Sequence, residues 1–413
     1  MPEFLRLVSP GEALAKWLSA IPQSSGLRIE EIETVSALDR ILAEEVASPH
    51  PLPPFARSTV DGYAVRAEDT FGASPSAPSY LRIIGEVTMG SVSTLQVSGG
   101  EATVVHTGGA IPSGANAVVM LEDTQDVPGG EIEVHRALGI GKNIIGEGED
   151  VKQGEVVLEP GHRLRPQEIG GLMALGKLQV SVFARPRVAI LSTGDEVVPA
   201  EAEPGPGQVR DVNSHSLAAL VRRSGGEPVG FGIIPDHPET LYAEARRAHS
   251  SADLVVITAG SSASARDNTA AVVRRLGSPG VLVHGLAIKP GKPAILGVAE
   301  GIPVIGLPGN PVSAMVVAGL MVVPMLRRLS GEKRPSLVAT VSARLAANIP
   351  SEAGREDYVP ARLEASPQGW IADPVFGKSN LIFTLVRADG LIRIPPQATG
   401  LQAGSMVNVI PFD

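Results

Sequence analysis

The chain has 413 residues, no cysteine and a formal net charge of −9; its length indicates two to four domains, because single domains contain roughly 100 to 200 residues. The acidic balance argues against nucleic acid as the main partner, since affinity for phosphate backbones comes from Lys and Arg. The lack of cysteine excludes disulfides, thiolate metal ligands and cysteine nucleophiles.

The first 45 residues are expected to be helical. Ser9, Pro10 and Glu12 form a capping box at the start of the helix ALAKWLSAI. The segment ALDRILAEEV, residues 37–46, predicts a second short helix.

The N-terminal stretch contains acidic residues and lacks an apolar segment before a small-residue cleavage site, so it does not fit a signal peptide. We therefore expect a cytoplasmic protein.

Residues 46–148 predict a β-rich domain, because Pro and Gly separate short β-branched runs such as YLRIIGEV, ATVVHTGG and AVVMLED. Residues 149–180 contain another short helix, PQEIGGLMAL, with Gly176 at its C-terminal cap. We expect this piece to rejoin residues 1–45 in one helical linker domain. The β-rich domain is then an insertion.

Residues 181–330 predict a doubly wound α/β domain. The strands are RVAILS, PVGFGII, DLVVIT and IPVIGL, and the helices are SHSLAALVRRSG, ETLYAEARRAHS, DNTAAVVRRLG and PVSAMVVAGLM. Continuously apolar strands between amphipathic helices indicate a parallel sheet that is covered on both faces.

One apolar stretch, residues 312–326, has about fifteen residues, fewer than the ~20 that a membrane-spanning helix needs. Pro324 is expected to interrupt it before Arg327 and Arg328. This stretch predicts a buried helix and no membrane association.

Residues 331–413 return to short strands, as in LVATVSARL, DYVPARLE, LIRIPP and SMVNVIPF, which predict a small barrel or sandwich.

Three loops follow strands of the α/β region: TGDE at 193–196, AGSSASARD at 259–267, and PGNP, which comprises Pro308, Gly309, Asn310 and Pro311. Ligands of open parallel sheets bind beyond the carboxyl ends of the strands, where loop N–H groups act as donors. In the second loop the hydroxyls of Ser261, Ser262 and Ser264 add further donors. Each loop alone is also typical of an ordinary strand-to-helix turn, but the three together favour one pocket.

The usual catalytic motifs are missing, since the chain has no GxxxxGK[ST], no GxGxxG between a strand and a helix, no HExxH and no GxSxG. Lys289 and Lys292 flank a Pro-Gly bend that is able to present both ammonium groups to one anion; two solvated lysines are the alternative.

Six acids lie at turns: Asp61, Asp150, Asp195, Glu196, Asp236 and Asp267. Carboxylates around an anionic ligand suggest Mg²⁺, whereas each acid alone also fits a helix cap or a solvated surface.

Six segments occur together in an order and spacing that resemble the molybdopterin molybdenumtransferase family, which is related to the catalytic domain of gephyrin. They are FARSTVDGYAV, TGGAIPSGANAVVMLEDT, GKNIIGEGEDVKQG, LSTGDEVV, AIKPGKPA and GLPGNPVSA. Each segment is modestly specific, and the six in order cover essentially the whole chain.

The resemblance implies an elongated homodimeric subunit with a helical linker domain, an inserted β-rich domain, an α/β molybdopterin-binding domain and a C-terminal β-barrel. It implies molybdate and adenylylated molybdopterin as substrates, with Mg²⁺-dependent release of AMP. Molybdopterin adenylyltransferase and apo-molybdoenzymes are the implied pathway partners.

The resemblance also assigns residues. It implies activity roles for Asp61, Thr107 and Asp150, and places Glu196, with Asp195 before it, beside the pterin phosphate. It implies that Asp236 and Asp267 hold Mg²⁺ and the nucleotide. Lys289, Lys292 and Pro293 match one wall of an oxyanion pocket, and Arg355 and Ser379 match its other wall.

Other activities stay open at this point. The chain departs from the family at Val60, at Ala259 and Ser264, where glycines are usual, and in GKNIIGEGED, which lacks the usual arginines. A tungstate-preferring enzyme is therefore one alternative. A gephyrin-like scaffold without catalysis and a related activity, such as pterin adenylylation, are the others.

Overall fold

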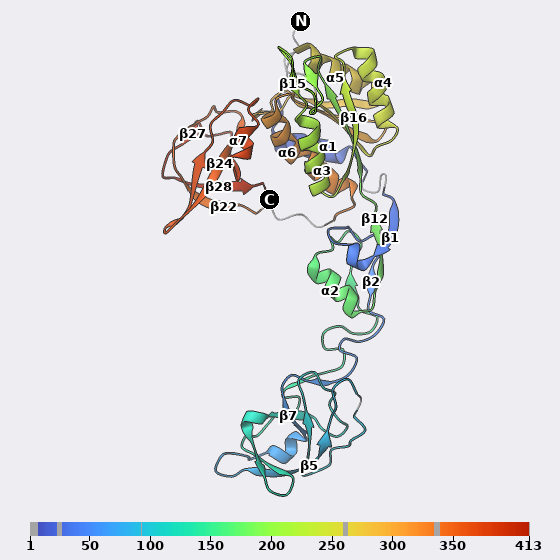
Figure 1. The fold of residues 1–413 in the computed structure, drawn as a ribbon, viewed down its shortest axis with the longest axis vertical. Helices are drawn as coiled ribbons and strands as arrows, with labels where there is room; N and C mark the ends of the chain where they lie inside the picture. Colours follow the sequence, from blue (N-terminus) through green and yellow to red (C-terminus); the bar gives the residue numbers. More distant parts are fainter. Residues whose placement is uncertain (1–6, 23–26, 92, 259–262, 334–338, 413) are drawn as a thin grey trace. The chain divides into compact units, whose positions relative to one another are not determined.

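A computed structural model describes residues 7–22, 27–91, 93–258, 263–333 and 339–412 (Figure 1). Its contacts divide the chain into two compact units. Unit 1 comprises Met1–Ala43, Pro160–Arg165 and Gln179–Asp413, and unit 2 comprises Glu44–Glu159 and Pro166–Leu178.

Unit 1 contains a six-stranded sheet with the order β16-β13-β17-β21-β20-β18. The strands are β13 (Arg187–Thr193), β16 (Glu227–Ile234), β17 (Leu254–Thr258), β18 (Pro279–His284), β20 (Ile295–Ala299) and β21 (Ile302–Leu307). The four predicted strands pair in parallel, as expected. Strands β18 and β20 were not anticipated. Strand β20 runs antiparallel to β21 because the short turn at Glu300 and Gly301 joins them as a hairpin.

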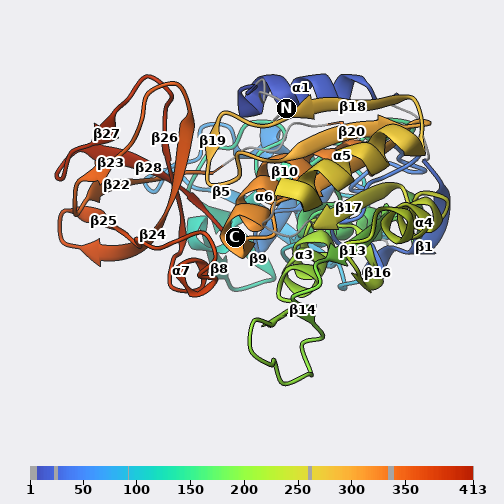
Figure 2. The same ribbon diagram turned by 90° about the horizontal axis from the view of Figure 1, so that it is seen from above.

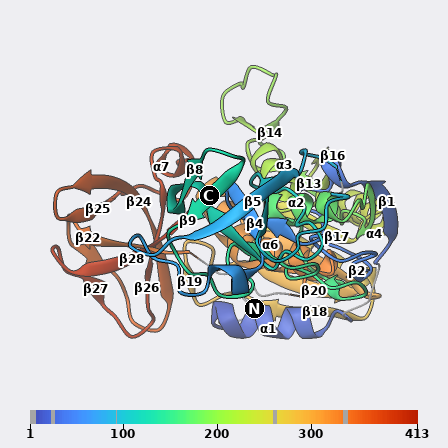
Figure 3. The same cartoon turned by 90° about the horizontal axis from the view of Figure 1, so that it is seen from below.

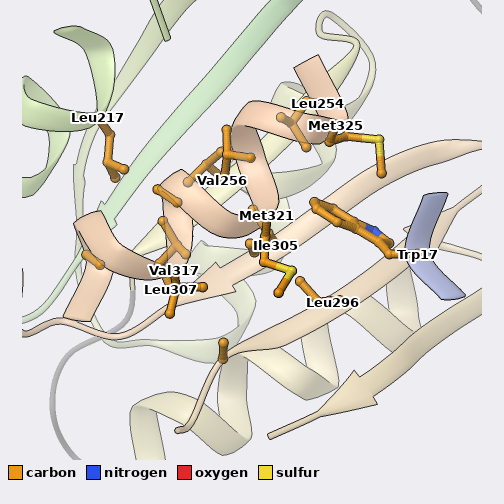
Figure 4. Close-up of a cluster of buried hydrophobic side chains, with 14 of the residues drawn as sticks. Trp17, Leu217, Leu254, Val256, Leu296, Ile305, Leu307, Val317, Met321 and Met325 are labelled. Carbon is orange, nitrogen blue, oxygen red and sulfur yellow. The ribbon is translucent and has the colours of Figure 1, made fainter. Parts of the chain in front are cut away.

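Helices cover both faces of this sheet. Helices α4 (Pro238–His249) and α5 (Ala263–Leu276) pack on one face, and α1 (Pro10–Ser19), α3 (Asn213–Arg223) and α6 (Pro311–Leu329) pack on the other. The core beneath α6 is shown in Figure 4, where Met321 and Met325 lie beside Trp17 of α1. The indole Nε1 of Trp17 donates to the carbonyl oxygen of Gly297 at 2.7 Å. The predicted doubly wound α/β domain is confirmed.

Helix α6 is long and apolar enough to cross a membrane by length and composition alone. Its side chains instead form much of the core of unit 1, including Val317, Met321, Val322 and Met325, which confirms the predicted buried helix. The expected interruption at Pro324 is wrong, because the helix continues to Leu329. Tight packing on the sheet holds the last turns although Pro324 donates no hydrogen bond.

The C-terminal strands of unit 1 form a closed five-stranded barrel in the order β24-β25-β22-β28-β26, and β26 pairs again with β24. The strands are β22 (Val341–Leu345), β24 (Glu356–Ser366), β25 (Gly369–Pro374), β26 (Gly390–Ile394) and β28 (Met406–Pro411), and the short helix α7 (Phe383–Val386) precedes β26. Strand β19 (Ile288–Lys289) pairs in parallel with β24 (Figure 2). The chain between β18 and β20 is thereby joined to the barrel.

Unit 2 contains a six-stranded sheet with the order β7-β4-β6-β5-β9-β8. Four of its strands, β4, β5, β8 and β9, are labelled in Figure 3. The strands are β4 (Gly62–Val65), β5 (Ser79–Glu86), β6 (Glu101–Val105), β7 (Ala117–Met120), β8 (Thr124–Val127) and β9 (Glu131–Val134). The expected strands in YLRIIGEV, ATVVHTGG and AVVMLED are confirmed as β5, β6 and β7. Their inward-facing side chains, such as Leu81, Ala102 and Val119, build a separate core.

Several short pairs complete the fold: β1 (Ile29–Glu33) with β12 (Gln179–Phe183), β2 (Val46–Ala47) with β11 (Val156–Leu158), and β3 (Arg57–Ser58) with β10 (Ile144–Ile145). Strand β23 (Ile349–Pro350) pairs with β27 (Gly400–Leu401), and β14 (Val197–Val198) pairs with β15 (Val209–Arg210). The connection between β14 and β15 extends away from the sheet (Figures 2 and 3).

Two of the three N-terminal and linker helices are confirmed. In α1, the hydroxyl of Ser9 accepts from the backbone N–H of Glu12 at 3.3 Å. Helix α2 (Pro166–Ala174) is followed by Gly176 with φ +70°.

The helix expected over residues 37–46 is wrong. The backbone N–H of Leu42 donates to the carbonyl of His162, and that of Ala43 donates to Ser181. These long-range bonds replace the bonds that a helix would need, and the buried side chains of Ile41 and Leu42 anchor the segment.

Candidate functional site

Acidic side chains gather at the carboxyl ends of β13 and β16. Asp195 and Glu196 follow β13, and Asp236 follows β16. The backbone N–H of Asp236 donates to Oδ1 of Asp195 at 3.1 Å. The adjacent strands place the two loops together, as expected for a ligand site at this edge.

Partial burial raises the pKa of the Asp236 carboxyl, and the negative charges of Asp195 and Glu196 raise it further, while a hydrogen bond from Thr193 acts in the opposite direction. Such a group gains from a nearby cation. No three His, Asp or Glu side chains among the described residues are arranged to hold a metal ion by themselves. These acids fit Mg²⁺ in the mode in which it takes one or two carboxylates and completes its shell with substrate phosphates and water.

Within the residues that it describes, the structure does not join the loop after β17 to these acids. Asp267 is exposed in the first half of α5, and no described hydrogen bond or ion pair joins it to Asp236. Ser262, like Ala259 and Ser261, lies outside the described residues, as does the side chain of Ser264. The expected phosphate contacts of this loop remain predictions.

The PGNP loop at the end of β21 is held from two sides. The side-chain Nδ2 of Asn213, at the start of α3, donates to the carbonyl of Gly309 at 2.8 Å. The side-chain Nδ2 of Asn310 donates to the hydroxyl of Ser379 at 2.9 Å, and the backbone N–H of Val312 donates to the Ser379 carbonyl at 3.0 Å. The loop therefore connects the α/β sheet with the C-terminal barrel through Ser379.

The lysine loop packs on the first turns of α6. Gly291, between Lys289 and Lys292, has φ +116°, and a Cβ atom there would lie 2.3 Å from Cγ2 of Val317. Only glycine therefore fits this bend. Both lysines are exposed, and neither makes an ion pair with a described residue. The fold thus leaves two cations available for an anion, next to Pro293.

Strand pairing brings the lysine loop to Arg355. Lys289 lies opposite Asp357 in the parallel β19–β24 pair, so the two side chains share one face. The Nε of Arg355 donates to Oδ1 of Asp357 at 2.9 Å, and its Nη1 lies 2.8 Å from Oε2 of Glu352. The predicted residues Lys289 and Arg355 are therefore both next to Asp357, although they are 66 positions apart in the sequence.

A second cluster lies in unit 2, at the ends of β4 and β6. Oδ1 of Asp61 accepts from the backbone N–H of Thr107 at 2.7 Å and from its hydroxyl at 3.1 Å. The backbone N–H of Thr107 lowers the pKa of Asp61 most, and its hydroxyl lowers it further. Nε2 of His106 lies 2.8 Å from Oε1 of Glu86. Asp61 and Thr107 are thus in contact, whereas no described side-chain contact joins Asp150 to them.

Sequence reasoning missed three residues that organise the site: Asn213, Glu352 and Asp357. A local signal existed for Asp357, because it follows Arg355 by two residues at the start of β24, a spacing that puts extended side chains on the same face. No local signal pointed to Asn213, whose partner Gly309 is far along the chain.

Comparison with known protein families gives three matches along the chain. Residues 8–176 match the MoeA N-terminal region (domain I and II), residues 189–328 match the probable molybdopterin binding domain, and residues 342–412 match the MoeA C-terminal region (domain IV).

Individual relatives are similar over nearly the full length. A putative molybdopterin biosynthesis protein of Methanocaldococcus jannaschii is 34% identical over 92% of this chain and 92% of its own length. A molybdopterin molybdenumtransferase of Haemophilus influenzae is 32% identical over 97% of this chain and 98% of its own length. The crystal structure of a molybdopterin biosynthesis MoeA protein of Pyrococcus horikoshii OT3 has a TM-score of 0.85 at 34% identity, and covers 98% of this chain and 100% of its own.

Proposed function

Since the chain belongs to the MoeA family of molybdopterin molybdenumtransferases, transferases of molybdenum cofactor biosynthesis, we propose that it inserts molybdenum from molybdate into adenylylated molybdopterin. AMP is released in this reaction, which depends on Mg²⁺. The protein acts in the cytoplasm as a homodimer.

The group of cations around β19 and β24 carries this proposal. Lys289 and Lys292 are exposed on a loop whose Gly291 packs against α6. Arg355 directly precedes β24, the strand that pairs with this loop. The hydroxyl of Ser379 and the amide of Asn310 add directed hydrogen bonds. A tetrahedral dianion needs this combination of positive charge and oriented donors.

The acids at the ends of β13 and β16 suit the nucleotide side of the substrate. Asp236, with Asp195 and Glu196 beside it, would hold Mg²⁺, and we keep Asp267 as a further ligand. When bound, the ion supplies positive charge to the pyrophosphate link. The protein's part is to position the two substrates and to neutralise their charge, and no residue is assigned as a covalent nucleophile.

The Asp61–Thr107 pair is the proposed contribution of the β-rich region, with Asp150 as a further activity residue. The two donors of Thr107 fix the ionised carboxylate of Asp61 as a hydrogen-bond acceptor. A molybdopterin adenylyltransferase supplies the substrate, and apo-molybdoenzymes accept the product.

Lys292→Ala tests the proposal. The purified protein is incubated with adenylylated molybdopterin, Mg²⁺ and either molybdate or tungstate, and AMP release is followed together with activation of an apo-molybdoenzyme. We expect the variant to need about ten- to a hundredfold more molybdate, because a charged hydrogen-bonding group is lost. Its affinity for the adenylylated pterin should stay near that of the wild type.

Arg223→Ala is the matched control, because it removes an exposed cation at the far end of α3. It should leave AMP release unchanged. Equal loss of molybdate use and of pterin binding in Lys292→Ala would contradict the assigned role. A wild-type chain that releases no AMP with either oxyanion would favour a scaffold instead.

A further inference from the structure

Arg355 is held by two carboxylates with very different surroundings. Asp357 accepts from its Nε at 2.9 Å, and the Asp357 side chain is only 4% exposed. Glu352 lies 2.8 Å from its Nη1, and the Glu352 side chain is 75% exposed. One partner is therefore fixed within the protein, whereas the other is almost entirely in solvent.

The local chain geometry explains this difference. Asp357 belongs to β24, and pairing with β19 on one side and β26 on the other fixes its backbone. Glu352 lies in the loop before β24, where Gly354 has φ +95° and turns the chain so that Glu352 reaches Arg355 three residues later. No other hydrogen bond of the Glu352 side chain is among those described.

Glu352 uses the part of Arg355 that an oxyanion also needs. A guanidinium binds carboxylates and tetrahedral oxyanions through the same N–H donors. Asp357 accepts a hydrogen bond only from Nε of Arg355. The Nη groups, one of which Glu352 contacts, are therefore the donors that a ligand would use. Lys289 lies opposite Asp357 in the β19–β24 pair, which brings a second exposed cation next to the residue that holds the Arg355 guanidinium.

We propose that Glu352 competes with the oxyanion substrate for Arg355 and is displaced when the oxyanion binds, while Asp357 keeps the guanidinium in place. This inference rests on the proposed function. Glu352 thereby sets the affinity for the oxyanion, and a weak anion does not displace it as readily as a compact dianion does.

Glu352→Gln tests the inference, with Glu364→Gln as its matched control. Glu364 pairs with Arg362 on the same strand, and both of these side chains are more than half exposed. Each full-length protein is titrated calorimetrically with sodium molybdate alone, at low and at high KCl concentration. The KM for molybdate in AMP release is a second readout.

We expect Glu352→Gln to bind molybdate about two- to fivefold more tightly at low salt, because the competing ion pair is exposed and weak. The gain should shrink at high salt, where surface charges are screened. The variant should lower KM and leave kcat unchanged. Glu364→Gln should match the wild type in each measurement.

Arg355→Ala separates failure of the inference from failure of the proposed function. If Arg355→Ala loses molybdate binding but Glu352→Gln binds like the wild type, Glu352 does not compete and the inference is wrong. A gain in Glu352→Gln that persists unchanged at high salt overturns it too. If Arg355→Ala binds molybdate normally, the proposed oxyanion site itself is wrong.

Discussion

Asp236 is a carboxylate whose ionised form the fold disfavours. Burial, and then Asp195 and Glu196, raise its pKa. In the pH range between its unfolded and its raised folded pKa, the folded state binds more protons. Stability therefore falls as pH rises through this range, and the penalty is fully present above the folded pKa.

Asp236→Asn should remove this penalty. At neutral pH we expect the melting temperature of unit 1 to rise by roughly 1 to 3 °C, with loss of Mg²⁺-dependent AMP release. The difference in melting temperature should vanish in acid, where wild-type Asp236 is protonated. Glu201→Gln, which removes an exposed carboxylate between β14 and β15, is the control and should change neither property. An unchanged or lower melting temperature at neutral pH would refute the prediction.

Glu356 shows the opposite behaviour inside the barrel. Its carboxylate accepts from Nε and Nη2 of Arg393 at 2.8 and 2.9 Å and from the hydroxyl of Tyr358 at 2.8 Å. The hydrogen bonds from Arg393 lower the pKa of Glu356 most, against the effect of burial. Its stabilising effect is therefore present above the unfolded pKa and is lost as pH falls through the folded pKa.

Glu356→Gln should destabilise the barrel by about 2 kcal/mol at pH 7, because hydrogen bonds to a charged group are lost. Denaturant unfolding at several pH values measures this difference, which should shrink below about pH 4. The control substitution Glu364→Gln, at an exposed side chain, should lower the free energy of unfolding by less than about 0.5 kcal/mol. A difference that does not vary with pH would mean that packing, rather than charge, explains the loss.

At the scale of elements, the lysine loop depends on its contact with α6. Gly291→Ala adds a Cβ atom that would lie 2.3 Å from Cγ2 of Val317, at a residue with φ +116°. The loop must then move away from the helix, at a cost of about 1–3 kcal/mol. We expect a roughly tenfold higher KM for molybdate, since Lys289 and Lys292 move with the loop.

Gly319→Ala is the matched control within α6, because a Cβ atom there meets nothing within 4 Å. It should leave the KM unchanged and slightly stabilise the helix. Steady-state AMP release and thermal unfolding measure both effects. A wild-type KM in Gly291→Ala would show that this packing does not position the lysines.

At the scale of the whole molecule, the two units have separate cores. Leu254 of β17 and Ile132 of β9 are both fully buried, one in each unit. We therefore predict two calorimetric unfolding transitions. Leu254→Ala should lower the temperature of the unit 1 transition, and Ile132→Ala should lower that of the unit 2 transition. Each substitution should reduce the free energy of unfolding of its unit by about 2–5 kcal/mol, as buried large-to-small substitutions do. One transition that both substitutions shift equally would show that the units unfold together.

The sequence by itself determined the elements whose causes are local. Apolar runs between amphipathic segments predicted the parallel strands β13, β16, β17 and β21 and the helices that cover them. A capping box predicted the start of α1, and Gly176 predicted the end of α2. Local residue types also drew attention to the lysine loop and to the acids near Asp236, whereas Arg355 came only from the family resemblance.

Only the tertiary structure decided the features that depend on distant partners. Residues 37–46 have helical composition, yet long-range hydrogen bonds to His162 and Ser181 take the place of helical ones. The register of β19 on β24 places Lys289 opposite Asp357, and Arg355 is shared between Asp357 and Glu352. Burial and long-range pairing outweigh local propensity at these positions, because each contact joins residues whose separation in sequence carries no periodic signal.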